Sequence, residues 1–286
     1  MVETPPVVLT VAGFDPSSGA GVTADIKTIA AHGCYGVACI TALTVQSTTG
    51  VRKVVPSEAG LVRETLEVLT ADAQPSAVRI GMLGSGGVVK AVVEFLEAAR
   101  PKLTNVVLDP ILRSSSGADL VDQAGARWLR DKLMPICDVV TPNTQEASAL
   151  TGIEVGDEDG MRLAASRLHE AGAKAVVITG GDLDQAVDLL SFTSKKGVQQ
   201  EIFRAPRQIS KATHGTGCAF ATAVACQLAL DRGLAEATLL AKVYVLAAMT
   251  AAYPIGQGTG PLNHLYRMNE SKRVLPASER VEKIHE

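Results

Sequence analysis

The chain has 286 residues, 47% of them hydrophobic and 20% charged, which is the composition of a globular protein with a sizeable core. The net charge of -3 and the aromatic content of 3% argue against a nucleic-acid-binding protein, which needs basic surface and stacking side chains. No apolar run approaches the roughly 20 residues of a membrane span, and the N-terminus lacks the basic start of a secretion signal. The five cysteines show no metal-ligand spacing such as CxxC. We therefore expect a cytoplasmic protein with reduced thiols.

Strand and helix signals alternate from residue 7 to residue 178. Continuous β-prone apolar runs predict strands that are buried on both faces, as in a parallel sheet. These runs are residues 7–12, 37–45, 77–80, 105–108, 138–140 and 175–178. Apolar residues at helical spacing predict helices at 22–31, 57–69, 124–133 and 145–150, around 89–96 and around 161–168. Ser57 is a candidate N-cap for one of these helices. The repeated units predict a mostly parallel sheet with helices on both faces.

The pattern changes after residue 181. Residues 187–193 and 198–205, joined by the turn 195–197, predict a β-hairpin. A helix of small residues is then expected at 219–230 and a mostly apolar helix at 234–253. Because we find neither a linker nor an internal repeat, we expect one domain over residues 1–286. Its core is expected at about 7–266, followed by a charged, loosely held tail at 267–286.

The glycine-rich turn at residues 213–218 (THGTGC) carries the strongest functional signal. Gly215 and Gly217 have no Cβ, so the backbone can turn sharply and a ligand can approach it closely. The first amides of the following helix lack intrahelical partners and carry the positive end of the helix dipole, which favours a bound anion. The same field is expected to favour the thiolate of Cys218. The alternative interpretation is a plain strand-to-helix connection with a small buried cysteine.

Three acids stand at or just beyond the ends of predicted strands, where ligands bind in open α/β sheets. Asp109 directly follows an apolar strand, a costly position unless it has a partner such as Mg²⁺. Glu146 could hold a metal-bound water or could cap a short helix. Asp25 is the third acid. We interpret His214 as a turn or hydrogen-bonding residue rather than a metal ligand.

Several other enzyme classes lack their sequence motifs here. The glycine-rich segment 81–87 does not end in the Lys-Ser/Thr of a P-loop, and no clean GxGxxG follows the first strand. No GxSxG is present, which argues against an α/β-hydrolase. Phosphoryl transfer suits the parts that remain, because it needs positioning and charge neutralisation more than covalent chemistry.

An ordered set of segments resembles the hydroxymethylpyrimidine/phosphomethylpyrimidine kinases, a family of the ribokinase superfamily. The segments are 12–21 (AGFDPSSGAG), 24–27 (ADIK), 40–46 (ITALTVQ), 80–83 (IGML), 106–110 (VVLDP), 141–143 (TPN) with Glu146, 213–218 and 258–264 (GTGPLNH). Together they span about residues 7–266. The resemblance implies a ribokinase-like three-layer α/β/α sandwich, with a mostly parallel central sheet, a small β-hairpin near 187–205 and a homodimeric assembly.

The resemblance also implies a reaction in thiamine biosynthesis. The family uses ATP and Mg²⁺ to phosphorylate the hydroxymethyl group of 4-amino-5-hydroxymethyl-2-methylpyrimidine, and then to convert the monophosphate into the diphosphate. Cys218 stands where the superfamily usually has an aspartate, so it is expected to act as the base. Gly215, Thr216 and Gly217 are expected to form an anion hole.

The remaining family positions divide into three groups. The expected substrate-binding residues are Gly13, Asp25, Gln46, Met82 and Ile111. Gln46 would pair with the pyrimidine edge through its amide, which both donates and accepts, and Asp25 would accept from the amino or hydroxymethyl group. Met82 and Ile111 would pack on the ring. The nucleotide positions are Asn143, Glu146, Thr179 and Gly181, and the Mg²⁺ positions are Asp109 and Glu146.

One segment departs from the family pattern. The loop at 179–182 reads Thr-Gly-Gly-Asp, where the family commonly has Lys-Gly-Gly-His. Loss of this cation weakens the Coulomb attraction to ATP phosphate and bears most on the second phosphorylation. Lys27 or Lys211 could compensate, although both also suit a solvated surface.

Two rival functions stay open on the sequence. A pyridoxal kinase with the same Gly-Thr-Gly-Cys turn would also act on a hydroxymethyl group of a flat heterocycle. Gln46 in its Val-Gln-Ser-Thr context favours the pyrimidine, and neither Cys34 nor Cys39 is a convincing additional lid cysteine. The second rival is a non-catalytic ligand-binding protein of this fold, against which the intact Cys218 turn and Asp109 argue.

Overall fold

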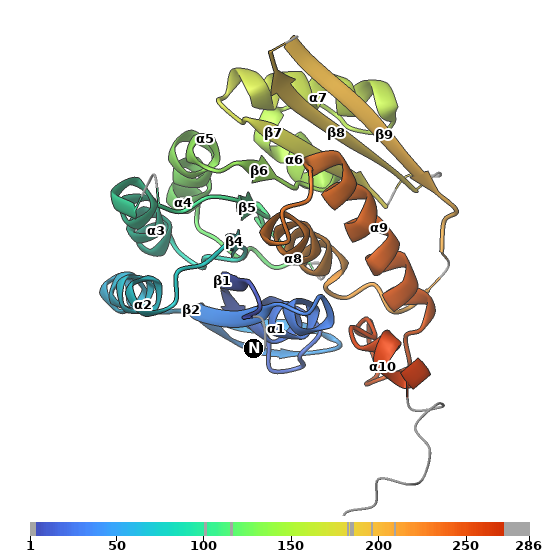
Figure 1. The fold of residues 1–286 in the computed structure, drawn as a ribbon, viewed down its shortest axis with the longest axis horizontal. Helices are drawn as coiled ribbons and strands as arrows, with labels where there is room; N and C mark the ends of the chain where they lie inside the picture. Colours follow the sequence, from blue (N-terminus) through green and yellow to red (C-terminus); the bar gives the residue numbers. More distant parts are fainter. Residues whose placement is uncertain are drawn as a thin grey trace, which may run out of the picture.

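The structure is a computed structural model that describes residues 4–99, 102–114, 117–181, 183, 186–195, 197–208 and 210–271. In this part of the chain a nine-stranded sheet runs in the order β3-β2-β1-β4-β5-β6-β7-β8-β9 (Figure 1). The strands are β1 (Val7–Phe14), β2 (Tyr35–Ser47), β3 (Gly50–Pro56), β4 (Ala77–Ile80), β5 (Val106–Leu108), β6 (Val139–Val140), β7 (Ala175–Gly180), β8 (Ala186–Ser194) and β9 (Gly197–Ala205).

The six strands from β2 to β7 in this order are parallel, and the added strands at both edges are antiparallel. β1 pairs with β2 on one side and with β4 on the other, so the order of the strands reverses at β1. Such a reversal opens a crevice at the carboxyl ends of the strands, which is where ligands bind in this class of sheet.

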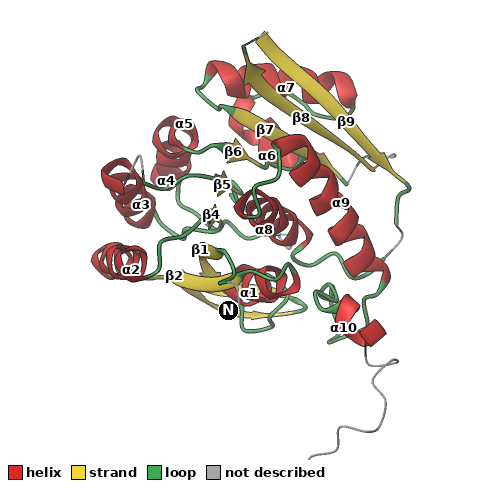
Figure 2. Cartoon of the chain, viewed as in Figure 1, coloured by secondary structure: helices red, strands yellow, loops and turns green. Residues whose placement is uncertain are grey.

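Helices cover both faces of the sheet, which gives the three layers in Figure 2. One face carries α1 (Gly21–Ala31), α8 (Thr216–Ala229) and α9 (Leu234–Thr250). The other carries α2 (Ala59–Asp72), α3 (Gly86–Ala99), α4 (Gln123–Trp128), α5 (Met134–Ile136), α6 (Thr144–Thr151) and α7 (Glu158–Glu170). A π-helical turn (Leu129–Leu133) joins α4 to α5. The mostly parallel α/β/α sandwich that the sequence predicts is therefore confirmed.

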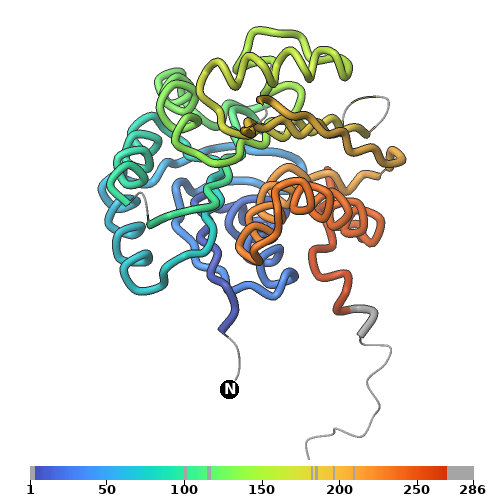
Figure 3. Tube along the Cα trace, turned by 45° about the horizontal axis from the view of Figure 1, so that its top comes forward, coloured from blue at the N-terminus to red at the C-terminus, as the bar shows by residue number. Residues whose placement is uncertain are grey.

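The two cores follow from the alternation of side chains along buried strands. In β5, Val106 and Leu108 join the core beneath α2 to α7, whereas Val107 joins the core beneath α1, α8 and α9. α8 is buried nearly all round because most of its side chains are small, and it lies side by side with α9 (Figure 3). No helix of the described residues combines the length and the apolarity needed to cross a membrane.

The predicted hairpin is present as β8 and β9, although Lys196 in its turn lies outside the described residues. Strand β3 is not among the predicted strands, because two charged residues interrupt its short apolar run. Ser57 is not the N-cap of α2, which begins after Glu58; its hydroxyl instead donates to the carbonyl of Ile40 (2.9 Å). The predicted tail begins within a short helix, α10 (Tyr266–Ser271), and residues 272–286 lie outside the described part.

Candidate active site

A cleft of about 1200 Å³ lies at the carboxyl ends of the parallel strands, at the reversal beside β1. Loops that follow β1, β2, β4, β5, β6 and β7 contribute to its lining, together with the turn before α8. The expected residues that line it are Gly13, Gln46, Met82, Asp109, Ile111, Asn143, Glu146, Thr179, Gly181, Gly215, Thr216, Gly217 and Cys218. The fold thus brings together segments that are far apart in the sequence.

The turn before α8 opens the start of that helix towards the cleft. Gly215 is the N-cap residue and adopts a left-handed conformation with φ of 79°, and a Cβ there would overlap the carbonyl of Gly19. No side chain caps the helix start. Gly217 and Cys218, which follow in the first turn, also line the cleft. The start of this helix can therefore offer its amides and the positive end of its dipole to an anion.

A buried ion network lies beneath the cleft. Arg79, from the middle of β4, contacts Asp25 at 3.0 Å and Asp109 at 2.6 Å, and its side chain is fully buried. Asp25 also accepts hydrogen bonds from Thr10 (2.6 Å) and Thr222 (2.8 Å). These contacts join β1, β4, α1 and α8. They also give each buried charge a partner, without which its burial would be costly.

The expected role of Asp25 as a substrate contact is wrong for this structure. Its side chain is 0% exposed and is absent from the cleft lining, and its oxygens are occupied by Arg79, Thr10 and Thr222. The residue that reaches the ligand side of the network is Asp109, which lines the cleft. Arg79 is not among the predicted site residues, although an arginine inside the apolar run Ala-Val-Arg-Ile is a signal for a buried carboxylate partner.

Cys218 is buried at the start of α8 beside this network, with Arg79 and Asp109 as hydrogen-bonding neighbours. Burial raises the pKa of its thiol to about 12; Arg79 lowers it, whereas Asp109 and Asp25 raise it further. The expected preference for the thiolate is therefore wrong for this structure. Desolvation and two carboxylates outweigh the field of the helix.

Asp109 and Glu146 are the two carboxyl groups that face the cleft. Burial raises the pKa of Asp109 to about 6, since the opposing effect of Arg79 is partly offset by Asp25. Burial, followed by repulsion from Asp109, raises the pKa of Glu146 to about 8. The local negative charge is thus undercompensated, which fits a divalent cation.

The described residues contain no preformed group of three or more His, Cys, Asp or Glu side chains able to hold a metal. Two carboxylates suit Mg²⁺ nevertheless, because this ion commonly takes its other ligands from phosphates and water. Glu146 also completes a capping box of α6. Its backbone N–H donates to the side chain of Asn143 (2.8 Å), and its carboxylate accepts from the N–H of Asn143 (2.9 Å). The capping interpretation is confirmed, and the carboxylate still lines the cleft.

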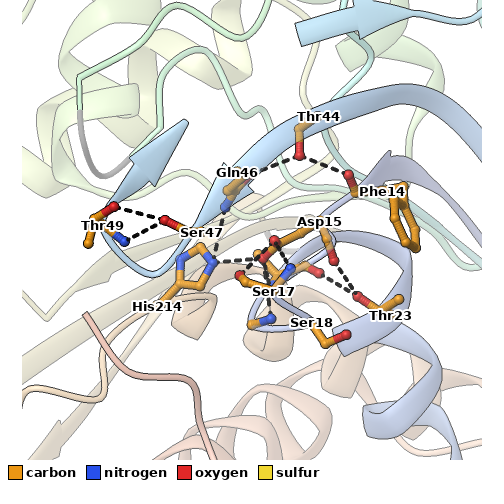
Figure 4. A network of polar contacts seen from close by, with 12 residues as sticks. Phe14, Asp15, Ser17, Ser18, Thr23, Thr44, Gln46, Ser47, Thr49 and His214 are labelled. Atoms are coloured by element: carbon orange, nitrogen blue, oxygen red, sulfur yellow. Dashed lines mark hydrogen bonds and ion pairs between the residues drawn. The ribbon is translucent and has the colours of Figure 1, made fainter. Parts of the chain in front are cut away.

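A second polar network holds Gln46 at the cleft wall (Figure 4). His214 Nε2 lies 2.8 Å from Asp15 Oδ2 and 3.2 Å from Gln46 Nε2. Thr44 Oγ1 lies 3.2 Å from Gln46 Oε1. His214 is therefore a hydrogen-bonding residue, as expected. Asp15 is more than the turn-forming residue that its place before a proline suggests, because it joins the loop after β1 to the turn before α8.

Few positively charged side chains line the described part of the cleft. Lys27 donates to the carbonyl of Ser18 (2.9 Å) and Lys211 is exposed, and neither lines the cleft. Among the described lining residues, Arg113 is the one lysine or arginine, and it is an exposed partner of Asp119. Asp182, the last residue of the divergent loop, lies outside the described residues. The missing cation at Thr179 thus has no replacement among these lysines.

Comparisons with known proteins agree with this architecture. Residues 15–263 match the family model described as phosphomethylpyrimidine kinase. The hydroxymethylpyrimidine/phosphomethylpyrimidine kinase of Streptomyces coelicolor is 39% identical over 268 residues, which cover 93% of this chain and 97% of the relative. The thiamine biosynthesis bifunctional protein ThiED of Geobacter sulfurreducens is 42% identical over 260 residues. That match covers 90% of this chain but 52% of the relative, so the chain spans about half of its length.

Among solved structures, an ADP complex of pyridoxal kinase from Bacillus subtilis is similar, with a TM-score of 0.83 and 32% identity. The match covers 93% of this chain and 100% of that structure. With a family model that matches nearly the whole described chain and relatives well above 30% identity, this chain belongs to the phosphomethylpyrimidine kinase family of ribokinase-like kinases.

Proposed function

We propose that this kinase transfers the γ-phosphoryl group of ATP to the hydroxymethyl group of 4-amino-5-hydroxymethyl-2-methylpyrimidine, and then phosphorylates the monophosphate to the diphosphate. One observation carries the proposal. An open helix start, a cysteine and two undercompensated carboxylates meet in one cleft. This set supplies an anion hole, a base and cation ligands, which are the parts that phosphoryl transfer needs.

Cys218 acts as the base in this proposal. Its thiolate takes the proton of the substrate hydroxyl while that oxygen attacks phosphorus, and the amides of residues 215–217 stabilise the charge on the transferring group. Burial opposes the Cys218 thiolate most strongly, Asp109 and Asp25 oppose it further, and Arg79 favours it. We expect the thiolate to form when bound ligands offset the carboxylate charge in the cleft. Mg²⁺, held by Asp109 and Glu146, would neutralise phosphate charge when bound.

The two ends of the cleft bind different ligands in this proposal. Gln46, Met82 and Ile111 form the pyrimidine end, and Gly13 leaves room there, since a Cβ at this position would overlap the Met82 side chain. The nucleotide end is lined by Asn143, Thr179 and Gly181. A parallel backbone bridge joins Asn143, which follows β6, to Thr179 of β7. The monophosphate brings a further phosphate into a cleft that has no cation at Thr179. We therefore expect the second phosphorylation to be slower than the first.

Pyridoxal kinase is the second candidate, because the Bacillus subtilis structure of that name covers nearly the same length of chain. The decisive measurement is ADP release with ATP-Mg²⁺ and with hydroxymethylpyrimidine, its monophosphate or pyridoxal as separate acceptors. Turnover of both pyrimidines is the expected result. Turnover of pyridoxal alone would overturn the substrate assignment, and ligand-dependent stabilisation without ADP formation would favour the non-catalytic binder.

We further propose a cytoplasmic homodimer of single-domain chains. The edge pair β2 and β3 exposes Leu43, Val45 and Val55, and Leu43 lies directly opposite Val55. An apolar sheet face of this kind suits a second copy of the chain. Light scattering should give twice the mass of the chain, and Leu43→Glu should shift it to the single-chain mass.

A further inference from the structure

Two loops from opposite ends of the sequence interlock in the lining of the cleft. One is the loop after β1, residues 13–21, and the other is the turn before α8, residues 213–218. His214 Nε2 of the turn lies 2.8 Å from Asp15 Oδ2 of the loop, and only 13% and 4% of the two side chains are exposed (Figure 4). A buried polar contact of this kind holds its two partners in one arrangement.

Asp15 organises its own loop as a hydrogen-bond acceptor. Its carboxylate accepts from the backbone N–H groups of Ser17 (2.8 Å), Gly19 (3.2 Å) and Ala20 (2.9 Å) and from the Ser17 hydroxyl (2.7 Å). Burial alone would raise the pKa of Asp15, but the hydrogen bonds from His214 and Ser17 lower it below its usual value. Because an ionised carboxylate only accepts, Nε2 of His214 is assigned the hydrogen in their contact.

Glycines let the loop and the turn approach each other closely. A Cβ at Gly19 would overlap the His214 ring, and a Cβ at Gly215 would overlap the Gly19 carbonyl. A third segment holds the backbone of His214, whose N–H donates to the carbonyl of Gly260 (3.2 Å) beside a parallel bridge to Pro261. The ring and the backbone of His214 are therefore both fixed.

The turn depends on this outside support, because the hydrogen bonds within it are long. The N–H and the hydroxyl of Thr216 reach the Thr213 carbonyl at 3.4 and 3.2 Å, and no side chain caps α8. His214 directly precedes Gly215, the left-handed residue from which α8 starts. The place of His214 thus sets the directions of the amides that the proposed function assigns to the anion hole.

The loop after β1 also reaches the proposed base. It closes on itself through a bridge between Phe14 and Gly21, and a Cβ at Gly21, whose φ is 60°, would overlap the carbonyl of Gly13. The N–H of Gly21 donates to the Cys218 sulfur. Since Gly21 is the first residue of α1, the starts of α1 and α8 meet at this sulfur.

We infer that Asp15 and His214 are positioning residues that hold the anion-binding turn and the Cys218 sulfur in the arrangement that phosphoryl transfer requires. They act through Gly215 and Gly21 rather than by contact with the transferring group. The inference rests on the proposed function, because it concerns the same reaction. Preorganised donors act on charge that develops during transfer, so loss of the contact should lower kcat and leave KM nearly unchanged.

The test measures steady-state phosphorylation of hydroxymethylpyrimidine by the full-length protein. His214→Phe keeps the ring that packs on Gly19 but removes its N–H, and Asp15→Asn removes the charge while keeping the size. Each change should lower kcat about 10- to 100-fold and keep both KM values within about threefold of the wild type. ADP with aluminium fluoride, a mimic of the transferring phosphoryl group, should bind both variants about 10- to 100-fold less tightly, whereas ADP alone should bind unchanged.

Three matched variants test the contact itself. Ser17→Ala removes one hydroxyl donor from the same carboxylate and should keep kcat within about twofold of the wild type. His214→Gln, whose amide can donate to Asp15, should recover most of kcat. The double variant of His214→Phe with Asp15→Asn should be no slower than the slower single variant, because both changes break one contact.

Unchanged kcat in both single variants, a loss confined to KM, or additive losses in the double variant would overturn the inference and leave the kinase assignment intact. Absence of ADP release by the wild type with hydroxymethylpyrimidine would instead overturn the proposed function, and this inference with it.

Discussion

The pKa of Cys218 shows how strongly single residues depend on their surroundings in this cleft. A cysteine in the first turn of a helix is expected to ionise readily. Here burial and the carboxylates of Asp109 and Asp25 reverse the direction and raise its pKa to about 12. The sequence locates the cysteine but not the charges that converge on it, since Asp25 and Asp109 come from distant parts of the chain.

Cys218→Ala should lower turnover by at least about 100-fold, because it removes the proposed general base. The pyrimidine should bind with nearly unchanged affinity, since its recognition is assigned to the other end of the cleft. Steady-state rates together with calorimetry would check both statements. Cys226→Ala is the matched control, a buried cysteine of the same helix that does not line the cleft. Near-wild-type turnover of Cys218→Ala would remove the residue as the base.

Arg79 should be the most sensitive position of the buried network. Arg79→Met removes the partner of Asp25 and Asp109 while keeping the length of the side chain. Breaking a buried ion pair on one side costs about 3–5 kcal/mol of unfolding free energy, because it leaves an uncompensated charge. Urea denaturation would measure this loss. Arg63→Met, which breaks exposed pairs with Glu67 and Glu94, should leave the unfolding free energy nearly unchanged.

At the scale of elements, a buried histidine joins α1 to α9. His264 Nδ1 lies 3.1 Å from the Thr28 hydroxyl and 3.3 Å from the Tyr244 hydroxyl. Burial, assisted by the charge of Lys27, lowers the pKa of His264 to about 4. The unfolded chain therefore binds the proton first as the pH falls, so stability is lost between about pH 6.5 and pH 4.

The expected contribution of His264 is a loss of about 2 kcal/mol in unfolding free energy between pH 7.5 and pH 5. Urea titrations of the wild type and of His264→Gln at both pH values would isolate it, because the other groups titrate equally in both proteins. Asp109 and Glu146 act in the opposite direction, since their raised pKa values favour the folded state at lower pH. An equal pH dependence in the two proteins would contradict the assignment.

A second contact between elements supports the nucleotide end. Lys242 of α9 contacts Asp188 of β8 at 2.8 Å, and Asp188 also accepts from the N–H of Gly180 (3.2 Å). All three groups are buried. Lys242→Met should cost about 3 kcal/mol of unfolding free energy and should weaken ATP binding, because Gly180 precedes the lining residue Gly181. The double variant Lys242→Met with Asp188→Asn should recover part of the loss, and calorimetry with ADP would show the effect on the loop.

At the scale of the whole molecule, the sequence predicts the layers and the position of the cleft. Continuous apolar runs such as β4 mark buried parallel strands, and this pattern depends only on local side chains. The buried role of Asp25 was not predictable in the same way, because it is decided by partners from other segments, and two charged residues obscure the apolar pattern of the edge strand β3. Likewise, the Asp15–His214 contact joins residues 199 positions apart, and no spacing in the chain signals it.

The arrangement of the cleft implies that its two ends bind ligands independently. Gln46 belongs to β2 on one side of β1, whereas Asn143 follows β6 and Thr179 lies in β7, on the other side of β1. A ligand at 100 times its dissociation constant adds about 2.7 kcal/mol to the stability of the folded state, so thermal shifts report each end separately.

Gln46→Ala should therefore abolish most of the shift with the pyrimidine and leave the shift with ADP within about 1 °C of the wild type. Thr179→Ala is the reciprocal control and should affect ADP alone. Equal losses for both ligands in Gln46→Ala would indicate a folding defect and would contradict the separation of the two ends.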